Sequence, residues 1–413
     1  MKVLFLNFRN NPSSAILRIS DALTKVGVDV TIFSYISIVK KDNIFQIKGL
    51  GKILFTILFW YDIFVTRFVY KKTGRLFSKN SNLFSNFLSK IYYDFINHFD
   101  LIHLHWVGHG FISSDLLLKV KNDIIVLTMH DFYFITGGCH IPGECLNYID
   151  SCINCPAKTQ IQDFPFSNFK KKENLYLNKK IYVTAPSRTM AIKIKESYLG
   201  NLFREVIVVP NPIDISIYKP LSIDFKKEDL FNKLPEKKKF ILFVSNNLVD
   251  HNKGLDLLLT GLSLLNNLDS ICLLTVGNNY TQIPEELNLT YHHFGEINST
   301  IEMIKIYNLA SITVVPSRFE SFSQVTLEAM ACGSPVVAFD SSGPSEIITN
   351  NVNGFLIKSF SVEDYADKID SIISDDNLRK YLSKNARNSV INKYSHEAIG
   401  IMMKDYYNKI IHA

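Results

Sequence analysis

The sequence lacks several features that would place this protein outside the folded, globular proteins. It has no low-complexity run, and 47% of its 413 residues are hydrophobic, which does not fit a largely disordered chain. Met1 leads directly into the apolar run from Val3 to Leu6, without a charged leader and a cleavage site, which predicts a cytoplasmic protein. A chain of this length suits two domains of roughly 200 residues each.

The longest apolar stretch also falls short of a membrane span. Residues 53–70 contain Asp62 and Arg67, and each charge near the middle of a spanning helix costs about 2.5–3.5 kcal/mol. We expect a helix that is either buried in a core or lies on an anionic lipid surface. The basic residues that favour the second alternative, beside four aromatics, are Lys52, Arg67, Lys71, Lys72 and Arg75.

The modest net charge of +6 hides two halves of opposite sign. Residues 1–205 hold 26 Lys and Arg against 15 Asp and Glu, a net +11, and the remainder holds 19 against 24, a net −5. An anionic partner is therefore expected on the basic half.

Short apolar runs alternate with helical patterns, which is typical of parallel, doubly wound sheets. The alternation stops in the Pro-rich, charged segment 210–238 and then starts again. We predict an α/β fold with two Rossmann-like domains, 1–209 and 239–413, that are joined by this linker and face a cleft. The last helix is a candidate to pack back on the first domain. The predicted strands are 3–6, 28–33, 101–104, 124–128, 181–184, 206–209, 240–244, 271–276, 312–315 and 336–339.

Two glutamates flank the predicted start of a helix after the strand ITVVP. Ser323 is a good N-cap, and Gly333 stands where such helices end. The amides at the helix start carry partial positive charge and suit a diphosphate. Glu320 stays in the loop, while Glu328 lies about 7–8 Å along the helix axis. Two carboxylates on opposite sides of a diphosphate suit a nucleotide sugar, which has a ribose at one end and a hexose at the other.

The motif Glu320-x7-Glu328 followed by Ala-Met-Ala-Cys-Gly-Ser-Pro-Val-Val resembles the signature of the retaining glycosyltransferases of GT-B fold, family four. The order of segments is similar along nearly the whole chain. The resemblance implies that Glu320 contacts the donor sugar as a catalytic residue and that Glu328 contacts the ribose hydroxyls. It further implies that the helix start holds the donor diphosphate, with Ser321, Phe322, Ser323, Gln324 and Val325 in the donor site.

A second loop resembles the phosphate-binding loop of that family. In SNNLVDHNKG, residues 245–254, Lys253 matches the lysine that neutralises donor phosphates. Asn247 stands near the position where an arginine is usual, so Arg318 is a candidate substitute for the missing charge.

The first loop departs from the family pattern. NFRNNPSSA replaces the glycine pair that many members have after strand one. The hydroxyls of Ser13 and Ser14 can still donate to a phosphate or sugar, and Arg9 can contribute as well. The alternative is that these residues form an ordinary helix entry.

His130 follows the predicted strand that ends at Thr128, at the edge where a ligand is expected. In the family, a histidine at this place lies close to the reacting sugar, which makes His130 a catalytic candidate. A lone histidine that is simply a surface or core residue is the alternative.

Four of the six cysteines lie in one cysteine-rich insertion, residues 137–156. Thiolates with a Cys-x2-Cys pair can form a tetrahedral structural zinc site, and free thiols or labile disulfides are the alternatives. A subgroup of the family with polysaccharide-building roles has a similar TGGCH segment. The candidate ligands are Cys139, Cys145, Cys152 and Cys155, with His140 as a spare.

The resemblance predicts a metal-independent hexosyltransferase that needs no cofactor besides its nucleotide-sugar co-substrate. The chain has no Asp-x-Asp motif. The aromatic, basic first half suits a growing, polyprenyl-diphosphate-linked oligosaccharide as acceptor at the inner face of the cytoplasmic membrane, as in capsule, O-antigen or exopolysaccharide assembly. Nucleic acid is not an expected partner. The alternatives are another GT-B enzyme, such as a nucleotide-sugar epimerase, and a non-catalytic, degenerate partner protein.

Overall fold

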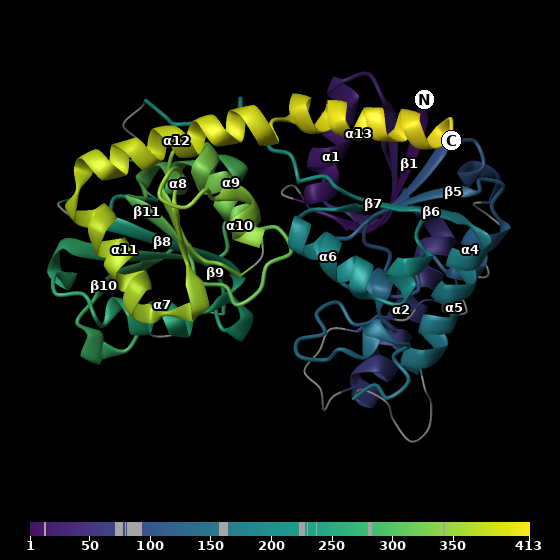
Figure 1. Cartoon of the computed structure of the whole chain (residues 1–413), viewed down its shortest axis with the longest axis horizontal. Helices are drawn as coiled ribbons and strands as arrows, with labels where there is room; N and C mark the ends of the chain where they lie inside the picture. Colours follow the sequence, from purple (N-terminus) through teal and green to yellow (C-terminus); the bar gives the residue numbers. More distant parts are fainter. Residues whose placement is uncertain are drawn as a thin grey trace. The chain divides into compact units, whose positions relative to one another are not determined.

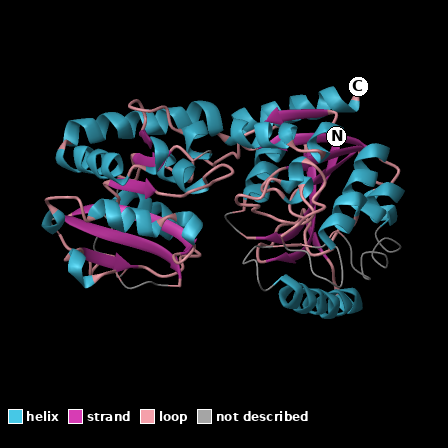
Figure 2. Ribbon diagram, turned by 60° about the horizontal axis from the view of Figure 1, so that its bottom comes forward, coloured by secondary structure: helices cyan, strands magenta, loops and turns pink. Residues whose placement is uncertain are grey.

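The computed structural model describes residues 1–11, 14–70, 77–78, 80, 93–156, 164–222, 228, 230–236, 238–279, 283–341 and 343–413. It divides into two compact units, Met1–Pro210 with Ile399–Ala413, and Asn211–Ala398. In each unit, helices lie against a central sheet (Figures 1 and 2). Every strand pair in both sheets is parallel. This confirms the predicted α/β fold with two Rossmann-like, doubly wound sheets.

The first unit contains a seven-stranded sheet of order β3-β2-β1-β4-β5-β6-β7. Its strands are β1 (Lys2–Asn10), β2 (Asp29–Ser37), β3 (Ile44–Gln46), β4 (Leu101–Leu104), β5 (Ile124–Thr128), β6 (Lys180–Ala185) and β7 (Glu205–Val208). Its helices are α1 (Ala15–Lys25), α2 (Gly49–Tyr70), α4 (Ser114–Lys119), α5 (Phe164–Asn178), α6 (Arg188–Glu196) and most of α13 (His396–Ile411).

The second unit contains a six-stranded sheet of order β10-β9-β8-β11-β12-β13. Its strands are β8 (Lys239–Asn247), β9 (Ile271–Asn278), β10 (Thr290–His293), β11 (Ile312–Val315), β12 (Val336–Phe339) and β13 (Phe355–Ile357). Its helices are α7 (Leu255–Leu262), α8 (Thr300–Leu309), α9 (Gln324–Ala331), α10 (Gly343–Ile347), α11 (Val362–Ser374) and α12 (Asp376–Tyr394).

The strands of the second unit read as continuous apolar runs because both faces of its sheet are covered. Along β8, Phe240 and Leu242 belong to one buried cluster, whereas Ile241 and Phe243 belong to another. Successive side chains of a strand point to opposite faces, so the two clusters are the two cores of a doubly wound sheet.

Two segments outside the sheets supply core residues: the segment predicted as a linker, which was not expected to be buried, and the last helix, which was a candidate to pack on the first domain. Ile213 and Tyr218, from the segment predicted as a linker, are buried in a core of the second unit. Helix α13 buries Met403 and Tyr407 in the core of the first unit, where it lies beside α1 (Figure 1). In both places, apolar and aromatic residues within otherwise polar stretches determine the packing.

Helix α2, which covers residues 53–70, has one buried face and one exposed apolar face. Its Phe55 is fully buried, with its ring 4.2 Å from that of Tyr35. The other face exposes large apolar side chains by 38% to 70%: Ile53, Leu54, Ile57, Trp60, Tyr61 and Phe64. The residues Lys71, Lys72 and Arg75 lie outside the described residues, as do the side chains of Asp62 and Arg67. No helix in the described part of the chain is both long and apolar enough to cross a membrane.

The docking of α13 depends on a buried hydrogen bond. The hydroxyl of Tyr407 lies 2.5 Å from Nδ1 of His103, and both side chains are fully buried. The neighbouring Tyr406 hydroxyl is also buried, but it has no hydrogen-bond partner in the described part of the chain.

We expect Tyr407→Phe to lower the free energy of unfolding by about 1–3 kcal/mol, because it leaves a buried imidazole nitrogen without a partner. Tyr406→Phe is the matched control and should leave stability unchanged or raise it. Urea unfolding followed by tyrosine and tryptophan fluorescence measures both changes. Equal losses in the two variants would contradict this account of the hydrogen bond.

Candidate functional site in the second unit and its counterpart in the first

The loop after β11 presents the start of α9 as a potential anion site. The N-cap Ser323 has φ +83°, and its hydroxyl accepts a hydrogen bond from the backbone N–H of Thr326 at 3.4 Å. The first amides of any α-helix have no acceptor within the helix, so they can bind an anion. Gly343 at the start of α10 lies against this loop, because a Cβ there would be 2.4 Å from the carbonyl oxygen of Phe322.

Glu320 and Lys253 form an ion pair beside this helix start. Nζ of Lys253 lies 2.8 Å from Oε1 of Glu320, and the hydroxyl of Ser317 donates to the same oxygen at 3.0 Å. The Lys253 and Glu320 side chains are 29% and 17% exposed, so a ligand can reach both. Lys253 follows β8 and Glu320 follows β11. These strands are neighbours in the sheet, and this adjacency brings the two residues together.

The backbone fixes the loop that carries Lys253. The carboxylate of Asp250 accepts from the N–H of Asn252 at 3.0 Å and so caps the turn His251–Lys253. The following residue, Gly254, has φ +74°, and a Cβ there would lie 2.0 Å from the carbonyl oxygen of Pro316. Only glycine combines this left-handed backbone with so close an approach. The loop after β8 is therefore held directly against the loop after β11.

Arg318, the candidate substitute for the family's arginine, is bound to a carboxylate in the structure. Its guanidinium donates to Asp256 at 3.0 and 2.6 Å and also to the carbonyl oxygen of His251. Its hydrogen bond to Asp256 is the main reason that the pKa of that carboxyl is lowered. The positive charge of Arg318 is thus largely neutralised within the protein.

Glu328 is the more buried of the two predicted acids, with 8% of its surface exposed. The hydroxyl of Tyr307 donates to its Oε2 at 2.9 Å. Burial, followed by the neighbouring Glu328, raises the pKa of Tyr307 well above its usual value, so the phenol remains a donor. Tyr307 lies on α8 and was not predicted, because nothing in the local sequence links it to a residue on α9.

The remaining predicted donor-site residues contribute in different ways. The side-chain oxygen of Asn247 accepts from Asn279 at 2.9 Å and carries no charge. Phe322 is 2% exposed and packs in the core, so only its backbone can meet a ligand. The residues that the structure places in the loop before α9 or in its first turn are Ser321, Phe322, Ser323, Gln324 and Val325.

In the first unit, polar residues gather at the carboxyl ends of β4 and β5. Nε2 of His130 lies 3.0 Å from Nδ1 of His105. The adjacent Asp131 lies 2.7 Å from Nδ1 of His140 and accepts from the indole of Trp106 at 3.0 Å. Burial would raise the pKa of Asp131, but His140 and a backbone N–H lower it overall. His105 was missed, although its spacing from His103 along a strand places both on the same face.

The loop after β1 contains one unsatisfied hydroxyl. Ser14 precedes α1, and its Oγ is buried with no hydrogen-bond partner in the described part of the chain. This is compatible with the predicted substrate contact. Arg9 is exposed, and Ser13 lies outside the described residues.

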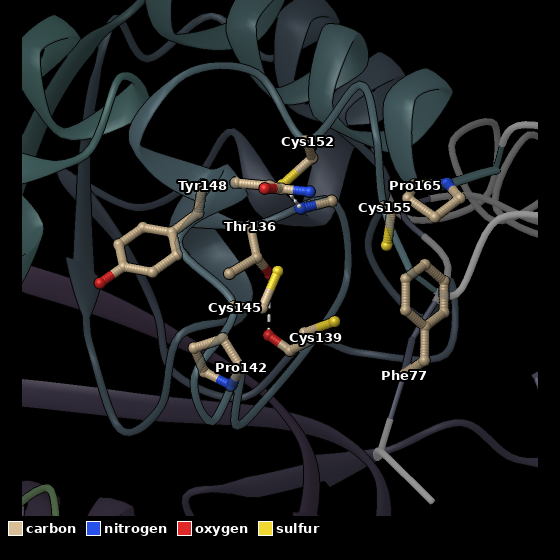
Figure 3. A pocket seen from close by; sticks show the side chains of 11 residues that line it. Phe77, Thr136, Cys139, Pro142, Cys145, Tyr148, Cys152, Cys155 and Pro165 are labelled. Atoms are coloured by element: carbon tan, nitrogen blue, oxygen red, sulfur yellow. Dashed lines mark hydrogen bonds between the residues drawn. The ribbon is translucent and has the colours of Figure 1, made fainter. Parts of the chain in front are cut away.

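The four cysteines of the insertion line one small cavity (Figure 3). Its volume is about 10 Å³, close to that of a single water site. The backbone N–H of Gly137 donates to Sγ of Cys152 at 3.3 Å. All four cysteines are free of disulfides. Among the described residues, no three His, Cys, Asp or Glu side chains lie close enough together to hold a metal ion.

Part of the chain is similar to a known protein family. Residues 224–389 match the family model described as Glycosyl transferases group 1. The capsular polysaccharide biosynthesis glycosyltransferase CapM of Staphylococcus aureus is 25% identical over 57% of this chain and 65% of its own length. N,N'-diacetylbacillosaminyl-diphospho-undecaprenol alpha-1,3-N-acetylgalactosaminyltransferase of Campylobacter jejuni is 26% identical over 48% of this chain and 53% of its own length. The chain thus spans only part of the length of these curated relatives.

Among solved structures, the complex of Anabaena Alr3699/HepE with UDP covers 99% of this chain and 100% of its own, with a TM-score of 0.65 and 16% identity. At this level of identity the likeness concerns the fold. Residues 224–389, which are less than half of the chain, are similar to the group 1 glycosyltransferases, and the chain as a whole has the GT-B fold.

Proposed function

We propose that the protein is a retaining glycosyltransferase that moves a hexosyl group from a nucleotide sugar to a growing oligosaccharide or polysaccharide. The observation that carries this proposal is the Lys253–Glu320 pair beside the start of α9. It combines a cation, a partly exposed carboxylate and helix-start amides in one place, which are the groups needed to bind a diphosphate and a sugar. The UDP complex of the similar Anabaena protein is consistent with such a donor.

Donor binding would exchange one ion pair for two separate contacts. Lys253 would turn to the donor phosphates and share their charge with the amides at the start of α9, while Glu320 would accept hydrogen bonds from the sugar. Both side chains are partly exposed, and the donor would replace the contact that each of them loses, so the ion pair can open when the donor binds. Glu328, held by Tyr307, would accept from the ribose hydroxyls.

The chemical step follows from where negative charge develops. As the bond between the anomeric carbon and the phosphate oxygen breaks, charge accumulates on the departing diphosphate, where Lys253 and the helix amides can stabilise it. The acceptor hydroxyl attacks from the same face, and its proton passes to the leaving phosphate oxygen. Stabilisation by these groups of the protein is the basis for proposing a metal-independent reaction. In the first unit, His130 is the residue that we propose to contact a sugar.

The acceptor that we propose is a polyprenyl-diphosphate-linked saccharide at the inner surface of the cytoplasmic membrane. The name of the similar Campylobacter enzyme specifies a diphospho-undecaprenol acceptor, and that of CapM specifies capsular polysaccharide biosynthesis. The exposed face of α2 supports a membrane location, because Trp60, Tyr61 and Phe64 are each at least 62% exposed. Aromatic side chains on one helix face favour the interface between lipid and water.

A structural zinc site is the role that we propose for the four cysteines. Four thiols match the donor set of such sites. Burial raises the pKa of the Cys152 thiol to about 11, and the hydrogen bond from the N–H of Gly137 acts in the opposite direction, so a bound ion would itself have to favour the thiolate. The cavity between the cysteines has room for a single ion, although the thiols would have to move closer together to coordinate it. A bound ion would fix the fold of the insertion and would take no part in transfer.

We expect Glu320→Gln and Lys253→Ala each to lower the rate of glycosyl transfer about 10²–10³-fold, because each removes a charge that is aimed at the donor. Lys305→Ala is the matched control: Lys305 forms a comparable pair with Glu228 at 2.6 Å in the same unit and should be dispensable. The assay measures nucleotide release and product formation with a panel of nucleotide sugars and lipid-linked acceptors.

Three outcomes of this assay would count against the proposal. Wild-type rates in both site variants would remove the assigned roles of Glu320 and Lys253. Conversion of a nucleotide sugar without any acceptor would indicate an epimerase. Nucleotide binding without turnover of any donor would indicate a non-catalytic partner protein, an alternative that the neutralised Arg318 favours.

For the membrane surface, we expect the double variant Trp60→Ser/Phe64→Ser to lose most of its binding to vesicles of anionic and zwitterionic lipid, because it removes large apolar groups from the exposed face of α2. The control is Leu177→Ser/Ile192→Ser, which removes side chains 66% and 56% exposed elsewhere on the same unit. Flotation of the full chain with vesicles measures binding. Flotation that is equal in both variants, or that shows no dependence on anionic lipid, would contradict the proposed surface.

For the cysteines, we expect the purified chain to contain about one zinc ion per molecule and the variant Cys152→Ser/Cys155→Ser to contain almost none. Cys272→Ser, which changes a buried cysteine of the second unit, should retain the metal. Elemental analysis and thiol titration under native conditions make the measurement. Four reactive thiols without metal, or a disulfide, would refute the zinc site.

A further inference from the structure

Three imidazole rings form a stack beneath the polar edge of the first sheet. His103 and His105 lie at the end of β4 and just beyond it, and His130 follows the neighbouring strand β5. The ring centroids of His103 and His105 are 4.3 Å apart, and those of His105 and His130 are 5.2 Å apart. His103 and His105 are at most 1% exposed, whereas His130 is partly exposed. The stack thus leads from the core of the first unit to the edge of its sheet where His130 is partly exposed.

The hydrogen bonds of the stack leave one of its fully buried nitrogens without a partner in the described part of the chain. His103 uses both nitrogens, Nδ1 towards Tyr407 at 2.5 Å and Nε2 towards Thr128 at 2.7 Å. His105 uses Nδ1 for the 3.0 Å contact with Nε2 of His130. Its other nitrogen, Nε2, is buried and has no hydrogen-bond partner in the described part of the chain.

All three imidazoles are neutral at physiological pH. Burial lowers the pKa of His130 to about 4 and lowers the pKa values of His103 and His105 well below the usual range. A neutral imidazole has one N–H donor and one acceptor nitrogen. The contact between His105 and His130 therefore contains one proton, which belongs to one ring or to the other.

The buried, unpartnered Nε2 of His105 decides whether His105 or His130 carries the shared proton. If His130 supplied the shared proton, His105 would carry its own proton on Nε2, as a buried N–H without an acceptor. Buried N–H groups without partners are rarer than buried acceptors without partners. The arrangement that avoids this leaves Nε2 of His105 as a bare acceptor, with the proton on Nδ1, donated to His130.

We propose that His105 fixes the tautomer of His130, so that His130 carries its proton on Nδ1 and presents an N–H donor, and no basic nitrogen, on its ligand side. His130 has no other hydrogen-bond partner in the described part of the chain. Its Nδ1–H can then bind an oxygen acceptor, such as a sugar hydroxyl or a phosphate oxygen, while the general base must be sought elsewhere. His105 is a positioning residue in this scheme, which rests on the proposed function only for the ligand's identity.

The tautomer can be measured directly in the full chain labelled with ¹⁵N-histidine. Long-range ¹H–¹⁵N correlations should show Nδ1 of His130 protonated and Nε2 unprotonated, with the signals assigned by their loss in His130→Gln. Because burial keeps the ring neutral, the pattern should persist between about pH 5 and 8. A protonated Nε2 on His130, or rapid exchange between the tautomers, would overturn the proposal without any variant of His105.

Two substitutions test the positioning role. In His105→Asn, the side-chain amide can still donate to His130, so the tautomer and the transfer rate should be retained. In His105→Leu, the donor is lost, so the Nδ1–H signal should weaken and transfer should fall about tenfold, the order expected for one hydrogen bond. Equal losses in both variants would indicate a merely structural role.

Two substitutions of His130 test whether its Nδ1–H is the group that contacts the ligand. The amide of His130→Asn can replace Nδ1–H, and that of His130→Gln is placed to replace Nε2–H. Transfer should therefore survive better in His130→Asn, and the reverse order would contradict the proposal. A wild-type protein that shows the expected tautomer but transfers no sugar would refute the proposed function and leave this inference standing.

Discussion

Parallel strand pairing is the constraint on which the arrangement of this molecule depends. When every strand of a sheet runs in the same direction, all loops that follow the strands emerge at one edge, and neighbouring strands bring neighbouring loops together. In the second unit this places the loops after β8 and β11 side by side, and with them Lys253 and Glu320. In the first unit the same rule gathers His105 and His130 after β4 and β5. In each unit, residues that are distant in sequence thus lie together at one edge of the sheet, and parallel strand pairing alone is enough to place them there.

The local backbone turns this general adjacency into a defined site. The N–H of Arg318 donates to the carbonyl oxygen of Asn252 at 2.8 Å, and the side chain of Asn252 donates to the carbonyl oxygen of Phe319 at 2.9 Å. Together with the close approach at Gly254, these bonds join two loops into one rigid unit. Rigid loops matter here because the site is held by hydrogen bonds, whose strength depends on distances being kept within a few tenths of an ångström.

The sequence predicts the strands best where they are buried in the middle of a sheet. Residues 101–104, 124–128, 312–315 and 336–339 were predicted with the bounds that the structure gives, because both faces of these strands are covered and most of their side chains are apolar. The edge strands β3, β10 and β13 were missed, because β3 and β13 have only three residues and β10, with the sequence TYHH, has no apolar run. Predicting Lys253 and Glu320 required the family motif, and their mutual ion pair could not be foreseen. The partner of Arg318, Asp256, lies 62 positions away, so a local pattern cannot reveal that the charge is already neutralised.

Some buried polar groups of this fold have few or no hydrogen-bond partners, which lowers the stability of the folded state. Glu328 is a carboxylate on a mostly buried helix, which is costly unless donors surround it, and Tyr307 supplies one donor from a different helix. Ser14 and His105 are less well satisfied than Glu328, since each has a buried polar atom without a partner in the described part of the chain. Protein interiors tolerate few such groups, and here both follow strands at the edge where a ligand is expected. The Tyr406 hydroxyl on α13 is unsatisfied in the same way, so the position of Ser14 and His105 after strands, and not the missing partner alone, makes these two residues candidates for ligand contacts.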